Sequence, residues 1–165
     1  MFFPQPPQVA QLDAWSAMPD HFRRPQRSDW ADANRGGGAV YDVAQIVQIS
    51  SLCQELKLPL HLDGARVMNA LAVNGLEPAA YGAYYDSISV CLSKGLGAPV
   101  GSLLIGSAAF IEKARRVRKV FGGGMRQAGI IAAGGLYALQ HNVERLQEDH
   151  LHALQLEKAL QSCSY

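Results

Sequence analysis

The chain has 165 residues, of which 48% are hydrophobic and 18% charged, with a formal net charge of +1. Such a composition is typical of a globular domain with a real core, and the near-neutral charge gives no reason to expect a nucleic-acid or membrane partner. Cys53, Cys91 and Cys163 form no CxxC pair, which favours neither a disulfide framework nor a metal site. We therefore expect a reducing, cytoplasmic location.

The first 35 residues differ from the rest of the chain in proline content and in periodicity. Five of the eight prolines lie between Pro4 and Pro25, and no helical or strand period persists there. Residues 1–35 are predicted to be an irregular, proline-rich leader. Residues 36–165 have the pattern of an alternating α/β domain.

Helices and strands follow one another from Asp42 onward. Asp42 caps a predicted helix whose apolar stripe continues to Leu56, before Pro59. The remaining pattern predicts strands over 60–63, 86–92 and 100–105 and helices over 64–74, 108–120, 126–139 and 142–160. The alternation and the apolar strands indicate an α/β fold with a mostly parallel sheet flanked by helices.

Two of the predicted strands end at residues that can carry chemistry. A lysine at the rim of a buried sheet, such as Lys94, is partly desolvated and can act as a nucleophilic amine. Asp63 ends the preceding strand, and ligands of open α/β sheets bind beyond the carboxyl ends of strands. Pyridoxal 5'-phosphate requires a lysine that binds its aldehyde and an acidic residue that pairs with its ring nitrogen. Lys94 as a surface lysine and Asp63 as a helix cap remain the alternatives.

Several sequence blocks in the same order resemble one known family. They are HLDGAR at 61–66, LSKGLGAPVGS at 92–102, GGGMRQAG at 122–129 and RLQEDH at 145–150. These blocks resemble the threonine aldolase family, in the aromatic amino acid β-eliminating lyase/threonine aldolase group of fold-type I pyridoxal-phosphate enzymes. The resemblance covers roughly residues 36–160 and implies part of the large domain of that transferase-like fold.

The resemblance implies roles for five residues. Lys94 would be the Schiff-base lysine, and Asp63 would be the partner of the pyridine nitrogen. Arg66 would reach the cofactor's phenolic oxygen or the substrate carboxylate, for which a planar guanidinium is suited. Ser93 would donate to the cofactor phosphate, and Arg126 would bind an anionic group of the substrate. A salt bridge, a structural turn and a helix-end role are the respective alternatives for Arg66, Ser93 and Arg126.

The same resemblance implies a reaction and a cofactor. Family members use pyridoxal 5'-phosphate to cleave threonine or allo-threonine to glycine and an aldehyde, which places them in threonine catabolism and glycine biosynthesis. We expect a small amino acid as substrate and a homo-oligomer, a dimer or a tetramer, for the full-length family. A β-eliminating lyase acting on aromatic amino acids is an alternative.

The resemblance leaves two parts of the family pattern unmatched. The N-terminal phosphate-binding loop and the C-terminal small domain have no counterpart in the 165 residues. We therefore expect an internal fragment that is inactive or impaired alone and binds the cofactor poorly. A catalytically inactive homologue or a dimerisation fragment is the alternative to an enzyme.

Two histidines and a basic run have simpler explanations. His61 in its strand and His150 on an apolar helix face are predicted to be structural rather than catalytic. The basic run at 113–119 lies near a helix end, where cations complement the helix dipole, and is predicted to be a solvated face.

Overall fold

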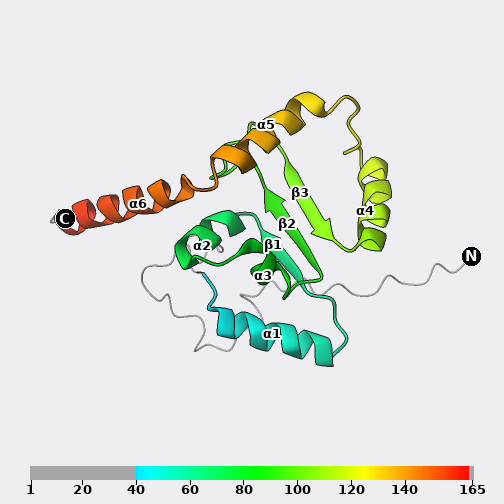
Figure 1. Ribbon diagram of the computed structural model, residues 1–165, viewed down its shortest axis with the longest axis horizontal. Helices are drawn as coiled ribbons and strands as arrows, with labels where there is room; N and C mark the ends of the chain where they lie inside the picture. The colour runs from blue at the N-terminus through cyan, green and yellow to red at the C-terminus, as the bar shows by residue number, and fades with distance from the viewer. Residues whose placement is uncertain (1–39, 164–165) are drawn as a thin grey trace, which may run out of the picture.

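The computed structural model describes residues 40–163, so the predicted leader at 1–35 lies outside the described residues. Figure 1 shows the strands side by side with helices around them. In chain order the elements are α1 (Val43–Glu55), β1 (His61–Gly64), α2 (Val67–Asn74), α3 (Pro78–Gly82), β2 (Ser87–Cys91), β3 (Ser102–Gly106), α4 (Ala108–Val120), α5 (Gly129–His141) and α6 (Leu146–Gln161).

Helix α1 begins at the predicted cap. The Asp42 carboxylate accepts a hydrogen bond from the Ala44 amide at 3.3 Å, and the Asp42 amide donates to the Gln45 side chain at 3.2 Å. This capping box satisfies amides that a helix start leaves without partners. Ile46 and Cys53 are buried on the apolar stripe, which confirms the predicted helix.

The later elements agree with the sequence pattern except at some boundaries. Helix α4 spans the predicted residues, and α2 ends at Gly75, which adopts the left-handed conformation with φ of 62°. Helices α5 and α6 begin at Gly129 and Leu146, later than predicted. Residues 122–128 form a connection in which Gln127 has φ of 50°, a value that does not continue a helix. The short α3 was not predicted.

The three strands form a mixed sheet in the order β1-β2-β3. Strands β1 and β2 are parallel, with His61 opposite Ser87, whereas β2 and β3 are antiparallel, with Cys91 opposite Ser102. The α/β class is confirmed, but β3 departs from the parallel arrangement expected of the sheet. Only residues 92–101 connect β2 to β3, and a parallel neighbour requires a crossover of about a dozen residues or more.

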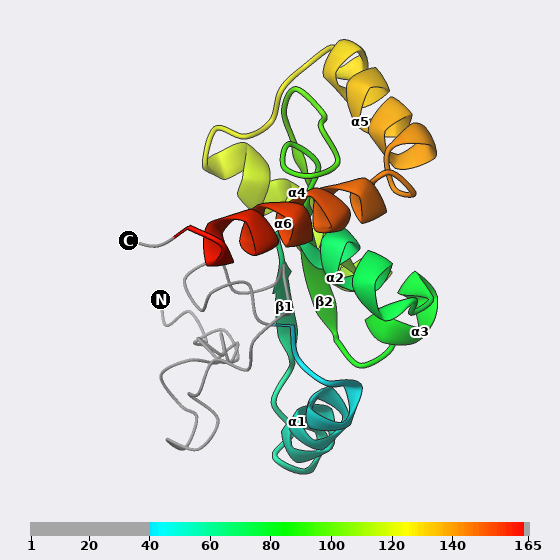
Figure 2. The same cartoon turned by 90° about the vertical axis from the view of Figure 1, so that its left-hand side faces the viewer.

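Two groups of buried side chains make up the core. The first gathers residues of α1, α2, α3 and β2, and α2 and α3 lie together beside β1 and β2 in Figure 2. The second joins the loop after β2 to α5 and to the start of α6. Its members are Leu92, Leu96, Ala98, Ala138 and Leu146. The loop at 92–101 is therefore part of the core rather than a surface excursion.

Helix α6 begins against this core and then projects away from the other elements (Figure 1). Leu146 at its start is 1% exposed, whereas Leu156 and Leu160 farther along are 65% and 61% exposed. None of the helices within residues 40–163 combines the length and apolar character that a membrane span requires.

Candidate active site

Asp63 and Lys94 belong to the same edge of the sheet. Asp63 lies in β1 opposite Ser89 of the parallel strand β2, and Lys94 follows the carboxyl end of β2. Parallel neighbours direct their carboxyl ends to one side, which is where open α/β sheets bind ligands. The topology therefore places an acid and an amine on the side where open α/β sheets generally bind ligands.

A short turn presents the Asp63 carboxylate. Its Oδ1 accepts a hydrogen bond from the Ala65 amide at 3.2 Å, and the side chain is exposed. The next residue, Gly64, packs so closely on β2 that an added Cβ would lie 2.8 Å from the Ser89 carbonyl oxygen. Glycine thus allows β1 and β2 to approach beside Asp63. The carboxylate is oriented by the backbone and remains open to solvent.

Lys94 lies on a loop that closes on itself. The Leu92 amide donates to the Gly101 carbonyl at 2.9 Å, the Ala98 amide to the Leu92 carbonyl at 3.0 Å, and the Gly97 amide to the Lys94 carbonyl at 2.8 Å. Leu92, Leu96 and Ala98 are buried beneath the loop. The loop is therefore compact, with apolar side chains directed toward the core.

Ser93 and Lys94 are exposed on the same loop. The partial desolvation predicted for Lys94 is therefore not provided by residues 40–163. The physical reason is that the short loop turns its apolar side chains inward and leaves the lysine on the outer side. The amine is free to meet a ligand from solvent.

The two candidate arginines lie on different elements. Arg66 is half-buried and occupies the position just before α2, directly after the Asp63 turn, without a side-chain capping hydrogen bond. Arg126 is exposed in the connection between α4 and α5. Within residues 40–163, no hydrogen bond or ion pair joins Arg126 to Asp63, Arg66 or Lys94. Asp63, Arg66, Ser93 and Lys94 thus lie at or just after the carboxyl ends of β1 and β2, whereas Arg126 belongs to the connection between α4 and α5.

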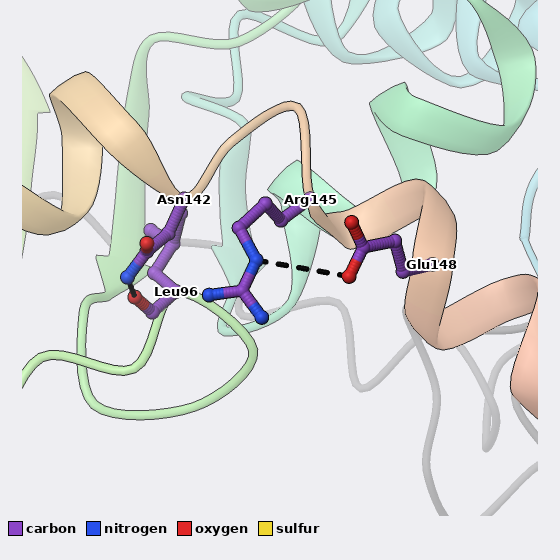
Figure 3. A network of polar contacts seen from close by, with 4 residues as sticks. All are labelled: Leu96, Asn142, Arg145 and Glu148. Carbon is purple, nitrogen blue, oxygen red and sulfur yellow. Dashed lines mark hydrogen bonds and ion pairs between the residues drawn. The ribbon is translucent and has the colours of Figure 1, made fainter.

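Sequence reasoning missed the residues that hold the Lys94 loop. Asn142, at the end of α5, donates its side-chain amide to the Leu96 carbonyl at 2.8 Å, as Figure 3 shows. Asn69 of α2 lies under Gly95, where an added Cβ would be 2.7 Å from the Asn69 Oδ1. Both contacts join segments far apart in the sequence, so no local pattern could have indicated them.

The two histidines have protein partners. A ring nitrogen of His61, Nδ1, is 2.8 Å from the Ser87 hydroxyl across β1 and β2. His150 Nε2 is 3.1 Å from the Asn69 carbonyl oxygen, linking α6 to α2. Both contacts agree with the structural roles predicted for them. No group of three or more His, Cys, Asp or Glu side chains in residues 40–163 is arranged to hold a metal ion.

Comparison with known sequences places this geometry in a family. Residues 31–165 match the family model of the beta-eliminating lyases. The chain is 45% identical over 125 residues to a probable low-specificity L-threonine aldolase of Schizosaccharomyces pombe, covering 76% of this chain and 33% of the relative. It is 48% identical over 127 residues to the low specificity L-threonine aldolase of Escherichia coli strain K12, covering 77% and 38%. The chain thus spans about a third of the length of these relatives.

Solved structures agree with the sequence comparison. A protein of Exiguobacterium sp. 255-15, assigned to the aromatic amino acid β-eliminating lyases/threonine aldolases, has a TM-score of 0.65 at 30% identity over 69% of this chain and 32% of its own. An L-allo-threonine aldolase assigned in Listeria monocytogenes has a TM-score of 0.77 at 24% identity over 96% of this chain and 44% of its own, and supports the fold alone. The predicted resemblance and fold-type I assignment are confirmed. The chain belongs to the beta-eliminating lyase family.

Proposed function

We propose that the chain supplies the lysine-bearing part of a pyridoxal-phosphate-dependent aldolase. Its reaction would be cleavage of the Cα–Cβ bond of threonine or allo-threonine to glycine and acetaldehyde. The observation that carries the proposal is the display of Lys94 on a closed loop at the same sheet edge as Asp63. The names of the relatives, low-specificity L-threonine aldolases, support this substrate class.

The residues at this edge fit the cofactor chemically. An amine, a carboxylate, a guanidinium and a hydroxyl lie on or beside the carboxyl ends of β1 and β2, from Lys94, Asp63, Arg66 and Ser93. Three backbone hydrogen bonds close the loop, and its Ser93 and Lys94 side chains are exposed to a ligand. When bound, pyridoxal phosphate supplies an electron-accepting ring for the electrons of the cleaved bond.

Each residue would have a distinct part in holding that group. Lys94 would bind the cofactor aldehyde covalently through its amine, and Asp63 would pair with the protonated ring nitrogen. Ser93 would donate its hydroxyl to the phosphate. Arg66 would bind the phenolic oxygen or the substrate carboxylate through its fork of N–H groups. Arg126 would reach the substrate carboxylate only if the connection between α4 and α5 lies over the same edge in the assembled enzyme.

Assembly with other polypeptide is part of the proposal. Strand β3, helix α4 and the residue that follows it expose apolar side chains, among them Leu104, Ile105, Val120 and Phe121. Contiguous exposed apolar surface is typical of a protein interface. We propose a homo-oligomer, a dimer or tetramer, and a cytoplasmic location, with which the free cysteines Cys53, Cys91 and Cys163 agree. The 165 residues alone would bind the cofactor weakly and be impaired or inactive.

The test is to locate the covalent bond to the cofactor. The purified chain is incubated with pyridoxal phosphate, reduced with borohydride and digested, and the modified lysine is identified by mass spectrometry. We expect modification at Lys94, its loss in Lys94→Ala and its retention in Lys113→Ala, a matched change of an exposed lysine on α4. Equal modification of other lysines with none at Lys94 would overturn the proposal.

A second assay separates the aldolase from its alternatives. Acetaldehyde and glycine formed from threonine, by the chain alone or reconstituted with other family subunits, would support the aldolase. Pyruvate and ammonia formed from an aromatic amino acid, without aldehyde from threonine, would favour the β-eliminating reaction. Neither product, together with binding to a full-length relative, would favour the inactive homologue or dimerisation fragment.

A further inference from the structure

A polar contact from Asn142 anchors the turn that carries Lys94 to another element. Residues 94–97 close through the hydrogen bond from the Gly97 amide to the Lys94 carbonyl at 2.8 Å. Leu96, in the middle of the turn, is 2% exposed, and its carbonyl accepts the Asn142 side-chain amide at 2.8 Å. Within residues 40–163 this is the one side-chain hydrogen bond made to the turn from another element. A part-buried carbonyl that lost this donor would be left poorly satisfied.

Helix α5 holds Asn142 in place and also packs against both ends of the loop. The Asn142 backbone amide donates to the Ala138 carbonyl at 2.9 Å, which fixes the residue at the helix end. Earlier in α5, an added Cβ on Gly134 would lie 2.9 Å from the Pro99 side chain. An added Cβ on Gly135 would lie 2.9 Å from the Leu92 side chain. The absence of side chains at Gly134 and Gly135 allows α5 to lie directly on the loop.

The opposite side of the turn is closed by packing. An added Cβ on Gly95 would lie 2.7 Å from Asn69 Oδ1 and 3.0 Å from Leu146 Cδ2. The turn therefore rests against α2 and the start of α6 on one side, and is tied to α5 on the other. With this packing in place, the Asn142 hydrogen bond limits how far Leu96, and with it Lys94, can rotate away from the core.

We propose that Asn142 is a positioning residue for Lys94. By holding the Leu96 carbonyl it fixes the turn at 94–97 and so the direction in which the Lys94 amine leaves the backbone. The inference rests on the proposed function of Lys94 in binding the cofactor. Asn142 acts through the turn and does not itself contact the reacting atoms.

The test compares three variants in the connection between α5 and α6. Asn142→Asp keeps the shape of the side chain and places a carboxylate oxygen against the Leu96 carbonyl. Arg145→Gln is the matched control, because the exposed Arg145 pairs with Glu148 at 3.7 Å, whereas Asn142 donates to Leu96 of the turn (Figure 3). Asn142→Gln restores an amide donor on a longer side chain.

Two measurements on the full chain report the effect. Hydrogen exchange follows the Gly97 and Ala98 amides, and mass spectrometry follows the rate of borohydride-trapped pyridoxal phosphate on Lys94 at limiting cofactor. In Asn142→Asp we expect at least tenfold faster exchange of these two amides and at least threefold slower modification of Lys94. Exchange of the β1 and β2 amides should change less than twofold. Arg145→Gln should match the parent chain, and Asn142→Gln should recover part of both effects.

The outcomes separate this inference from the proposed function. Unchanged loop exchange in Asn142→Asp, a uniform rise that includes β1 and β2, or faster loop exchange with unaltered modification of Lys94 would each overturn the role of Asn142. In all three cases modification of Lys94 in the parent chain still supports the proposed function. Absence of Lys94 modification in the parent chain would overturn the proposed function and the positioning role together.

Discussion

Two regions of the molecule differ in how well they are packed. The packed half comprises residues 40–101, α5 and the turn to Leu146, and it contains the buried hydrophobic side chains found within residues 40–163. The outer unit comprises residues 102–126, which form β3, α4 and the turn after it. No residue of the outer unit is buried, and Leu103, Leu104 and Ile105 of β3 are 40%, 42% and 50% exposed.

The difference separates what this chain can organise alone from what needs other polypeptide. Asp63, Ser93 and Lys94 belong to the packed half, so contacts within the chain determine the loop and strand end that carry them. The outer unit presents apolar residues and an edge of β3 that has no strand partner within residues 40–163, a combination that proteins ordinarily cover. Cofactor attachment should therefore depend on the packed half, and association on the outer unit.

The largest expected effect comes from breaking the packed half at Leu146. This side chain is 1% exposed in the core beneath the Lys94 loop, so Leu146→Ala should lower the free energy of unfolding by roughly 2–5 kcal/mol. Leu156→Ala on the same helix, 65% exposed, should change it by less than about 0.5 kcal/mol. Urea titration followed by circular dichroism measures both. Equal losses for the two variants would mean that Leu146 is not part of a cooperative core.

A smaller effect is expected from separating β1 and β2 beside Asp63. Gly64→Ala forces a Cβ to within 2.8 Å of the Ser89 carbonyl oxygen, so a backbone shift should cost roughly 1–3 kcal/mol. Gly129→Ala is the matched control, because an added Cβ there meets nothing within 4 Å. Thermal melts of the two variants provide the comparison. A Gly64→Ala melt that coincides with the parent's would contradict the tight strand contact.

Substitutions in the outer unit should change self-association rather than the free energy of unfolding. Ile105→Thr replaces an exposed apolar side chain, so the free energy of unfolding should stay within about 0.5 kcal/mol while self-association decreases. Ile46→Thr, at a position 3% exposed in the packed half, should instead destabilise the fold. Light scattering over a concentration series and a denaturant titration distinguish the two. If the Ile105→Thr variant associates as strongly as the parent chain, β3 is not part of the interface.

The smallest expected effect on stability concerns the buried thiol of Cys53 in the packed half. Burial, and secondarily the nearby charge of Asp86, raises the pKa of Cys53 above its ordinary value of 9.0. Because the folded state favours the neutral thiol, this contribution to stability is present below pH 9.0 and is lost as the pH rises through the folded-state pKa. Unfolding titrations from pH 7 to 10 should therefore show a steeper decline for the parent than for Cys53→Ala.

Alkylation gives an independent check of the same thiol. At pH 8, iodoacetamide should modify the exposed Cys163 at least about tenfold faster than the buried Cys53, since the thiolate is the reactive form. In urea, which unfolds the chain, the alkylation rates of the two cysteines should become similar. Comparable rates in the folded chain would show that Cys53 is accessible, contrary to its place on α1.

Local chemistry in the sequence determined several elements and the identity of the candidate site. Asp42 and Gln45 specify the start of α1 through a capping box, Gly75 ends α2, and Ser107 caps α4. Each signal acts within a few residues, so it can be read without knowing the fold. The motifs around Asp63 and Lys94 likewise predicted two strand ends and the family, because strand, turn and glycine chemistry are local.

Only the tertiary structure decided how these pieces meet. The antiparallel placement of β3, the outward position of Lys94 and the hydrogen bond from Asn142 to Leu96 were not predicted. The Asn142 contact spans 46 residues of sequence. Such contacts depend on the path of the chain between their partners and on which side chains compete for the core. A local pattern of residues determines neither the path of the chain nor this competition.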